Sequence, residues 1–473
     1  RGRDFSFDPK KLDITPESGG AQHGMSFDEW GHKFVCSNSD HIQAVMIDER
    51  YLARNPYLAV PRSRISIAAD GGQAEVYRKS PVEPWRLVRT RLRVAGLVRG
   101  PVEGGGWAAG YFTGSTGVTI YKGNAWPKAY HGQAIVGDVG SNIVHRKILE
   151  WNGLVPIARR VDEKREFVTS TDIWFRPVQF ANAPDGTIHI LDMYREVIEH
   201  PASLPPEIKK HLDLTSGRDR GRLYRVLPEG FQQPELPKLS QLETPELVSV
   251  LNNSNAWHRE TAARLLYERE DRSAVEPLRK LVGSAELPQT RMQALYVLDG
   301  LKALEESEVL TGLNDKHPQV RRHAIRLSEG GTLKVPAVRK QLLEMVEDPD
   351  LEVRYQLALT LGDLQSPQTA GALATLTKNA PGNQWMEWAV LSSLSNQAGD
   401  VFSQLANEKS FVKQTAGLAF LQELAQLIGR SGRQDDVAHV LKSITPLSAQ
   451  SQSTATTVVQ SLIAGLSKSQ SQL

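Results

Sequence analysis

Cysteine is almost absent from this chain: Cys36 is the only one among 473 residues. No disulfide can form within the chain, and metal sites built on paired cysteines are excluded. One thiol does not distinguish an oxidising compartment from a reducing one. The chain also lacks any apolar run near the ~20 residues that a membrane-spanning helix needs, so we predict no membrane span.

An excess of one charge is lacking as well, because 56 lysines and arginines face 54 aspartates and glutamates, a net charge of +2. This balance gives no reason to expect nucleic acid or an anionic membrane as the main partner. The basic run Arg86–Arg93 alternates charged and apolar residues. We therefore predict an amphipathic edge or outer strand there rather than a nucleic-acid site.

Several catalytic signatures are missing. The sequence has no glycine fingerprint for a dinucleotide and no Gly-Lys-Ser/Thr phosphate loop. It has no Cys-x-x-Cys-His motif, so this chain cannot attach a c-type haem covalently. Hydrophobic residues make up 40% and charged residues 23% of the sequence, which is typical of a protein with buried cores.

The first half repeats a strand-rich unit about three times between residues 20 and 225. The copies open near His23, Thr116 and Arg176, and each runs through a glycine turn to a second apolar strand that ends in Asn or Asp. Such units are typical of β-propeller blades. Because a closed propeller takes about 4–8 blades and the chain starts at Arg1, we expect the C-terminal part of something longer.

The second half is rich in Leu, Ala, Glu and Gln, with apolar residues at helical spacing. Arg259, Arg291, Arg321 and Arg354 recur at spacings of 32, 30 and 33 residues. This pattern resembles HEAT-type repeats, which must stack to bury their apolar faces, and we interpret the arginines as structural. We predict propeller blades over 1–227, a proline-rich linker over 228–239, a HEAT solenoid over 240–446, and a terminal helix with a frayed tail over 447–473.

Equivalent positions of successive blades converge on a central channel, so His23, Thr116 and Arg176 are candidates for one polar pocket. His23 would accept a proton near neutral pH, and Arg176 would clamp a carboxylate or oxyanion. The alternative is that His23 and Arg176 satisfy backbone carbonyls between blades.

The loops after the second strands are polar. Asp138 and Asp192 are candidate calcium ligands, since calcium prefers several hard oxygen atoms, and Tyr194 is a candidate cofactor contact. The alternative is that these aspartates cap turns through backbone hydrogen bonds. The insertion Glu196–Arg225 is too long for a plain hairpin, and we expect either a lid over the channel or an extension packed against the first HEAT repeat.

Three sequence segments carry a family resemblance: Gly24–His41, Phe175–Asn182, and Met193–Arg225 with its Asp-Arg-Gly-Arg-Leu-Tyr-Arg end. They resemble the putative membrane-bound dehydrogenases of planctomycetes and related bacteria. Those proteins look like a sorbosone or glucose dehydrogenase-type propeller followed by HEAT repeats and often by a cytochrome c domain.

The resemblance implies an extracytoplasmic protein that uses pyrroloquinoline quinone and calcium to oxidise sugars or alcohols, with a cytochrome c as a possible partner of the solenoid. Arg176 matches a position where that dehydrogenase type carries a quinone-contacting arginine. The blades that would carry the catalytic histidine of such enzymes are not in this chain.

A second hypothesis is a non-catalytic propeller–solenoid that binds glycans or proteins at the cell surface. Solenoids offer an extended face for partners. Four tryptophans are suited to stacking on sugars or, alternatively, to the core between blades: Trp107, Trp126, Trp151 and Trp174.

Overall fold

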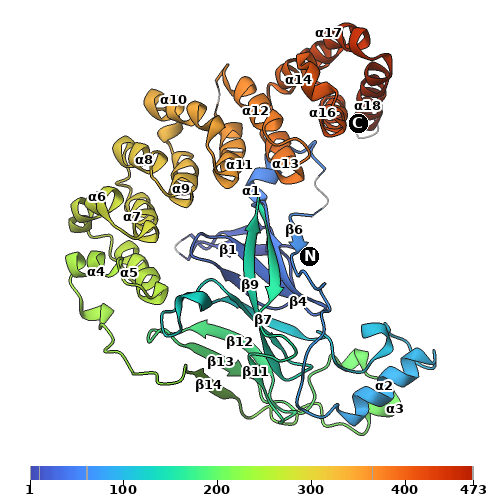
Figure 1. Cartoon of the computed structure of the whole chain (residues 1–473), viewed down its shortest axis with the longest axis vertical. Coiled ribbons are helices and arrows are strands. Elements are labelled where there is room, and N and C mark those ends of the chain that lie inside the picture. Colours follow the sequence, from blue (N-terminus) through green and yellow to red (C-terminus); the bar gives the residue numbers. More distant parts are fainter. Residues whose placement is uncertain (1, 10, 60–61, 365, 471–473) are drawn as a thin grey trace. The chain divides into compact units, whose positions relative to one another are not determined.

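The computed structural model describes residues 2–9, 11–59, 62–364 and 366–470. The chain divides into two compact units (Figure 1). The first unit comprises residues 1–46 and 63–268, and the second comprises residues 47–62 and 269–473. The second unit therefore includes a short segment that lies, in sequence, between two strands of the first.

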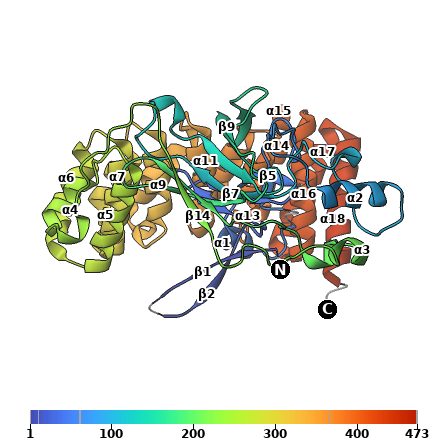
Figure 2. The same cartoon turned by 90° about the horizontal axis from the view of Figure 1, so that it is seen from below.

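Antiparallel sheets dominate the first unit, and the strands of each sheet follow one another along the chain, as in propeller blades. The first sheet is β3 (Met25–Phe27), β4 (Lys33–Ser37), β5 (Asp40–Val45) and β6 (Arg64–Ser66). The second is β7 (Ser115–Ile120), β8 (Ala134–Asp138), β9 (Ile143–Asn152) and β10 (Val155–Arg160), with β11 (Val168–Thr169) beside β9. The third is β12 (Pro177–Asn182), β13 (Ile188–Asp192) and β14 (Arg222–Val226). In Figure 2, β1 (Asp4–Phe7) and β2 (Ile14–Glu17) form a separate two-stranded ribbon.

The opening strands of the three sheets lie next to one another. The Ser26 hydroxyl on β3 accepts a hydrogen bond from the Ile120 amide at the end of β7 (3.0 Å), and Asn182 at the end of β12 donates to the Ile120 carbonyl (2.9 Å). The predicted sheet-rich region with three successive blade-like units is therefore confirmed. A closed propeller is not shown.

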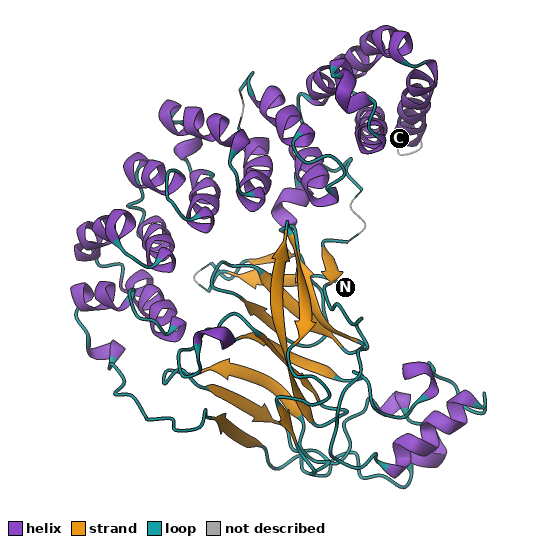
Figure 3. Cartoon of the chain, in the orientation of Figure 1, coloured by secondary structure: helices purple, strands orange, loops and turns teal. Residues whose placement is uncertain are grey.

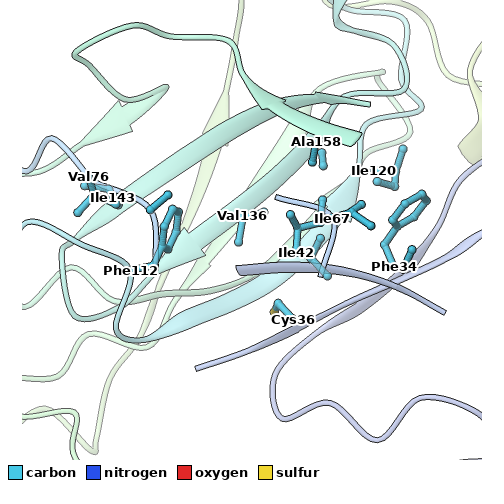
Figure 4. Packing of buried hydrophobic residues seen from close by; sticks show 14 residues of the cluster. Phe34, Cys36, Ile42, Ile67, Val76, Phe112, Ile120, Val136, Ile143 and Ala158 are labelled. Carbon is cyan, nitrogen blue, oxygen red and sulfur yellow. The ribbon is translucent and has the colours of Figure 1, made fainter. Parts of the chain in front are cut away.

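A hydrophobic core fills the space between the first two sheets (Figure 4). It joins Phe34 and Ile42 of the first sheet to Val136 and Ile143 of the second, and all four are fully buried. Cys36 lies in this core, where burial raises the pKa of its thiol to about 12. The only cysteine is therefore a small core residue rather than a reactive thiol.

The close approach of the opening strands depends on glycine. Gly117 has a φ of +59°, and a Cβ at this position would lie 2.7 Å from Gln179 Cα on β12. Gly132 has a similarly positive φ of +80° but open space around the same position. Comparing alanine substitutions at Gly117 and Gly132 therefore distinguishes the cost of backbone strain from the cost of steric contact between strands.

We expect Gly117→Ala to destabilise the first unit by about 1–3 kcal/mol more than Gly132→Ala. Both substitutions strain the backbone at a positive φ, but only the Cβ at position 117 also collides with a neighbouring strand. Urea unfolding followed by tryptophan fluorescence measures the difference. Equal destabilisation by the two substitutions would contradict close packing of β7 against β12.

Helices follow the sheets, as Figure 3 shows by colour. Helix α4 (Thr244–Val250) belongs to the first unit, and α5 (Ala256–Arg269) ends where the two units divide. The second unit contains α6 (Val275–Ser284), α7 (Pro288–Gly300), α8 (Glu306–Leu313), α9 (Pro318–Ser328), α10 (Pro336–Glu344), α11 (Leu351–Thr360), α12 (Thr369–Lys378), α13 (Gln384–Ser393), α14 (Ala398–Asn407), α15 (Lys409–Val412), α16 (Thr415–Ser431), α17 (Gln434–Gln450) and α18 (Gln452–Gln470).

These helices pair as a solenoid does. Helices α7, α9, α11 and α13 pack in succession as one layer, while α6, α8 and α10 form the other. The predicted HEAT solenoid is thus present as a helical region after the sheets. The predicted boundary between residues 446 and 447 falls inside α17, and α18 packs on α16. Of the predicted frayed tail, residues 471–473 lie outside the described residues.

The recurring arginines link one repeat to the next. Arg291 makes two hydrogen bonds to Asp315 (2.6 and 2.7 Å), and Arg321 makes the same pair to Asp348 (2.7 and 2.8 Å). Each also donates to the carbonyl six residues before it, and Arg354 repeats that bond with Asp348. These bidentate, charge-assisted contacts confirm the structural interpretation of the arginines.

Two local predictions were wrong. The basic run Arg86–Arg93 lies in an α-helix, α2 (Pro84–Val94), and not in a strand. Its arginines do not simply face solvent: Arg86 and Arg89 are buried beside Glu83 and Glu199. Alternation of charge is not evidence for a strand when the charged side chains find carboxylate partners inside the fold.

The insertion after β13 also differs from both expectations. Its buried residues Val197, Leu204 and Ile208, the last of these on α3 (Pro206–Lys209), pack against Trp85 of α2. The insertion is thus neither a lid nor an extension on the first HEAT pair, but the second half of a small helical subdomain.

Candidate functional site

Arg176, the residue that the resemblance linked to a quinone, is fully buried. Its guanidinium donates to the Glu83 carboxylate from both terminal nitrogens, at 3.2 and 3.1 Å. Its remaining N–H groups donate to three backbone carbonyls: those of Val139 (2.7 Å), Arg195 (2.9 Å) and Glu196. Because an arginine has five N–H donors, all of them are satisfied by the protein.

Thr116 lies on β7, His23 lies two residues before β3 and Arg176 directly precedes β12, but their side chains have separate partners. The Thr116 hydroxyl is buried and donates to the Pro177 carbonyl (2.6 Å). His23 lies at the surface, where partial burial lowers its pKa. The contacts of Arg176 match the alternative interpretation: this arginine satisfies backbone carbonyls.

Asp138 and Asp192 hold loops in place. Asp138 is fully buried and accepts hydrogen bonds from the amides of Thr113 (2.8 Å), Gly114 (3.0 Å) and Ser141 (2.8 Å). Asp192 accepts from the amides of Arg176 (2.7 Å) and Tyr194 (2.8 Å), and from Arg222 (2.7 Å). Burial raises the pKa of Asp138 despite these bonds.

These residues do not fit a quinone–calcium site. The donors of Arg176 and Thr116 are engaged by protein acceptors, and the carboxylates of Asp138 and Asp192 are bound by loop amides. Tyr194 packs against Trp174, with the Arg222 guanidinium 4.0 Å above its ring. Within the described part of the chain, no group of three His, Cys, Asp or Glu side chains is placed to hold a metal ion.

A second polar site lies in the second unit. Residues 47–59, which we call the docking segment, pack against the helix layer that contains α9, α11 and α13; Figure 1 shows its helix α1 (Glu49–Ala53) beside α13. We call the surface formed by Glu329, Gln356, Gly362, Leu391 and Ser392 the receptor surface. The segment has three buried side chains, Ile47, Tyr51 and Asn55 (1%, 2% and 1% exposed), and Tyr51 and Asn55 anchor it to this surface through hydrogen bonds.

Tyr51 is held through its hydroxyl. The hydroxyl donates to the Glu329 carboxylate (2.8 Å) and accepts from the Gln356 amide (2.8 Å). Burial raises the pKa of Tyr51, and the negative charge of Glu329 raises it further, so the phenol stays protonated and donates. Two guanidinium groups of the segment itself, those of Arg50 and Arg54, lie 4.4 and 5.2 Å from the ring centre.

Arg54 and Asn55 form hydrogen bonds with backbone carbonyls at the end of α13. Arg54 donates from Nε to the Ser392 carbonyl (3.0 Å) and from Nη2 to the Ser392 hydroxyl (3.1 Å). Asn55 donates to the Leu391 carbonyl (2.7 Å). The Arg54 guanidinium lies directly against Gly362: a Cβ there would lie 2.5 Å from Arg54 Cζ, so the end of the arginine side chain would have to move.

Ion pairs at the edge of the site are more exposed than these anchors. Arg50 lies 2.7 Å from Glu329 with its side chain 48% exposed, and Arg326 lies 2.9 Å from Asp48 with both side chains near 40% exposed. Exposed pairs of this kind contribute little to affinity. The buried phenol and the amide therefore determine what the receptor surface recognises.

Sequence reasoning missed this site. The docking segment contains neither a repeat nor a motif, and Glu329 falls outside the recurring pattern, whereas Gln356 lies inside the copy that begins at Arg354 but was not singled out. The available signal was the length of the connection between the segments that form β5 and β6, which is long for a hairpin.

Comparison with known proteins agrees with the two-part architecture. The family model described as "Domain of unknown function (DUF7133)" matches residues 1–230, and the HEAT-repeat model matches residues 244–326 and 306–395. No curated protein matches the chain. Among solved structures, the chain is similar to YibA of Escherichia coli at 19% identity. The match covers 49% of this chain and 99% of that chain, with a TM-score of 0.29. Of the helices described, none is long and apolar enough to cross a membrane.

Proposed function

We propose that this chain is a docking protein whose HEAT solenoid binds protein segments on the helix layer that contains α9, α11 and α13. The observation that carries the proposal is the docking segment itself, which is bound there through side-chain and backbone hydrogen bonds. HEAT repeats are interaction modules because their stacked helices expose a long continuous face.

The chemistry of the receptor surface supports this role. It offers a carboxylate, a side-chain amide and helix-end carbonyls, which recognise donors of a polypeptide rather than an apolar small molecule. A surface that recognises a few polar anchors and has a charged edge is typical of reversible protein contacts.

A random peptide library panned against a released form of the full chain, with Tyr51→Ala and Arg54→Ala, tests this function. We expect enriched peptides whose affinity falls at least about tenfold with Glu329→Gln or Gly362→Ala, the loss of one charged hydrogen bond or of one pocket. Gly371→Ala is the matched control, because a Cβ there meets only Gln404 at an ordinary 3.6 Å. Peptides indifferent to both receptor substitutions would refute the proposal.

The dehydrogenase function remains a separate proposal that rests on the sequence resemblance. It implies oxidation of sugars or alcohols outside the cytoplasm with pyrroloquinoline quinone, calcium and a cytochrome c partner. Because the carried-over residues do not fit the cofactor, other residues would have to bind it. The full-length chain incubated with calcium and quinone, assayed by dye reduction against aldoses and alcohols, tests the idea, and absence of both quinone binding and turnover would reject it.

A further inference from the structure

Building on the docking function, we propose that the receptor surface is specific for a partner segment that presents a tyrosine and, one helical turn later, an Arg-Asn pair, and that residues 47–59 occupy this site as an internal competitor. The ligand class follows from what the receptor surface contacts. A second copy of this chain and an unrelated peptide are outcomes of the test below.

The tyrosine requirement comes from complementary donors and acceptors. Glu329 can only accept while Gln356 donates, and the Tyr51 hydroxyl satisfies both at 2.8 Å. Phenylalanine would fill the same volume but lose the hydrogen bonds that the Glu329 carboxylate and the Gln356 amide make to the phenol hydroxyl, and losing a buried hydrogen bond weakens binding. Thr360 also bonds to Glu329, so the carboxylate is held in place for its ligand.

The requirement for arginine comes from the shape of the guanidinium group and its contacts. The guanidinium lies over Gly362 and bonds to both the carbonyl and the hydroxyl of Ser392. A lysine has one compact ammonium group and cannot form this fork. Asp363 adds a negative charge 3.5 Å from Arg54 at the edge of the pocket, which favours a cationic ligand.

The segment is suited to being displaced. Its only regular structure is the five-residue helix α1, and its buried residues Ile47, Tyr51 and Asn55 are separated by residues that are exposed or half-buried. A helix this short is not stable by itself, so the segment is ordered by the receptor surface. A partner with the same anchors would compete for the same contacts, and its apparent affinity would be reduced by the fraction of sites already occupied.

A fluorescent synthetic peptide of residues 46–59 is the probe. We expect it to bind the released chain and to bind the unaltered chain at least about tenfold more weakly. Tyr51→Phe or Arg54→Lys in the peptide should each weaken binding about tenfold, and the Arg54→Lys effect should vanish when the chain carries Gly362→Ala. A scrambled peptide is the control.

Hydrogen exchange of the unaltered chain gives a readout that does not depend on the released form. Excess peptide is expected to speed exchange at the amides of residues 50–56, and the scrambled peptide is not. The inference is overturned if library peptides bind the layer while the 46–59 peptide neither binds nor competes, a result that leaves the docking function intact. A peptide-reversible dimer of the released chain, detected by its mass in solution, would assign the site to a second copy instead and would also overturn it.

Discussion

Arg176→Met is expected to destabilise the first unit by about 3–5 kcal/mol, the cost of breaking a buried ion pair by removing one of its members. The substitution removes both hydrogen bonds to Glu83, whose carboxylate is buried, and frees three backbone carbonyls. Methionine keeps much of the side-chain volume, so the loss reports the polar contacts. Urea unfolding followed by tryptophan fluorescence measures it, because most tryptophans lie in this unit.

Arg159→Met is the matched control for this experiment. Arg159 pairs with Glu150 at 2.7 Å, but both side chains are about half exposed, so we expect a change within about 1 kcal/mol. Adding Glu83→Gln to Arg176→Met should not recover the loss, since Arg78 and Arg86 would then lose their carboxylate partner. If Arg176→Met is as mild as Arg159→Met, Arg176 is not a structural residue and its assignment to a ligand site is restored.

Glu83 keeps two arginine partners when Arg176 is replaced. Burial alone would raise the pKa of Glu83, but Arg86, Arg176 and Arg78 lower it below its usual value. Two arginines therefore remain beside this position after Arg176 is removed. The cluster joins α2 to the start of β12, which is why one buried arginine stabilises segments far apart in the sequence.

Acid is expected to destabilise the first unit through His41. This side chain is fully buried, bonds through Nδ1 to the Gly72 carbonyl (2.8 Å) and stacks on Phe112 at 4.1 Å. Burial lowers the pKa of His41 well below 6.5, and its Nε2 has no hydrogen-bond partner. The folded state therefore excludes a proton that the unfolded state binds below about pH 6.5.

The sign and size follow from linkage. Stability is unaffected above the unfolded pKa and is lost as the pH falls below it, by about 1.4 kcal/mol per unit for one histidine. Between pH 7 and pH 5, His41→Gln should therefore lose about 2 kcal/mol less than the unaltered chain. His211→Gln, at an exposed position, is the control and should leave the pH dependence unchanged. Parallel curves for His41→Gln and the unaltered chain would show that His41 does not control it.

Neighbouring groups set the background for that measurement. Lys147 and His145 lower the pKa of His41 further, while Asp70 raises it. His145 bonds to Glu166 at 2.5 Å, and burial raises the pKa of that carboxyl. Protonation of Glu166 in the folded state offsets part of the acid effect, so the difference between variants, and not the total pH dependence, isolates His41.

Repeats were predictable from the sequence because they are local and periodic. The opening strands of the sheets and the recurring arginines of the solenoid were identified from spacing alone, since strand alternation and helix stacking constrain residue type at fixed intervals. Arg291 and Arg321 bond to aspartates one repeat away, as a stacked solenoid requires.

Where a polar side chain points was not predictable in this way. His23, Thr116 and Arg176 lie at or just before the opening strands of the three sheets as aligned, yet Thr116 and Arg176 turn into the protein because carbonyls and Glu83 are within reach there. Helix α2 was mistaken for a strand because the carboxylates that allow its arginines to be buried come from other parts of the chain or from its own N-terminus.

By itself, the sequence determined the order of the two architectures, the repeat pattern and the absence of several catalytic motifs, all of which depend on composition and short-range spacing. Only the tertiary structure decided that the predicted quinone contact is a buried structural arginine and that a connection between strands is bound by the solenoid. The bond between Tyr51 and Glu329 joins residues 278 positions apart. No local pattern encodes such a contact, because it exists only once the helices have stacked and placed the carboxylate beside the amide.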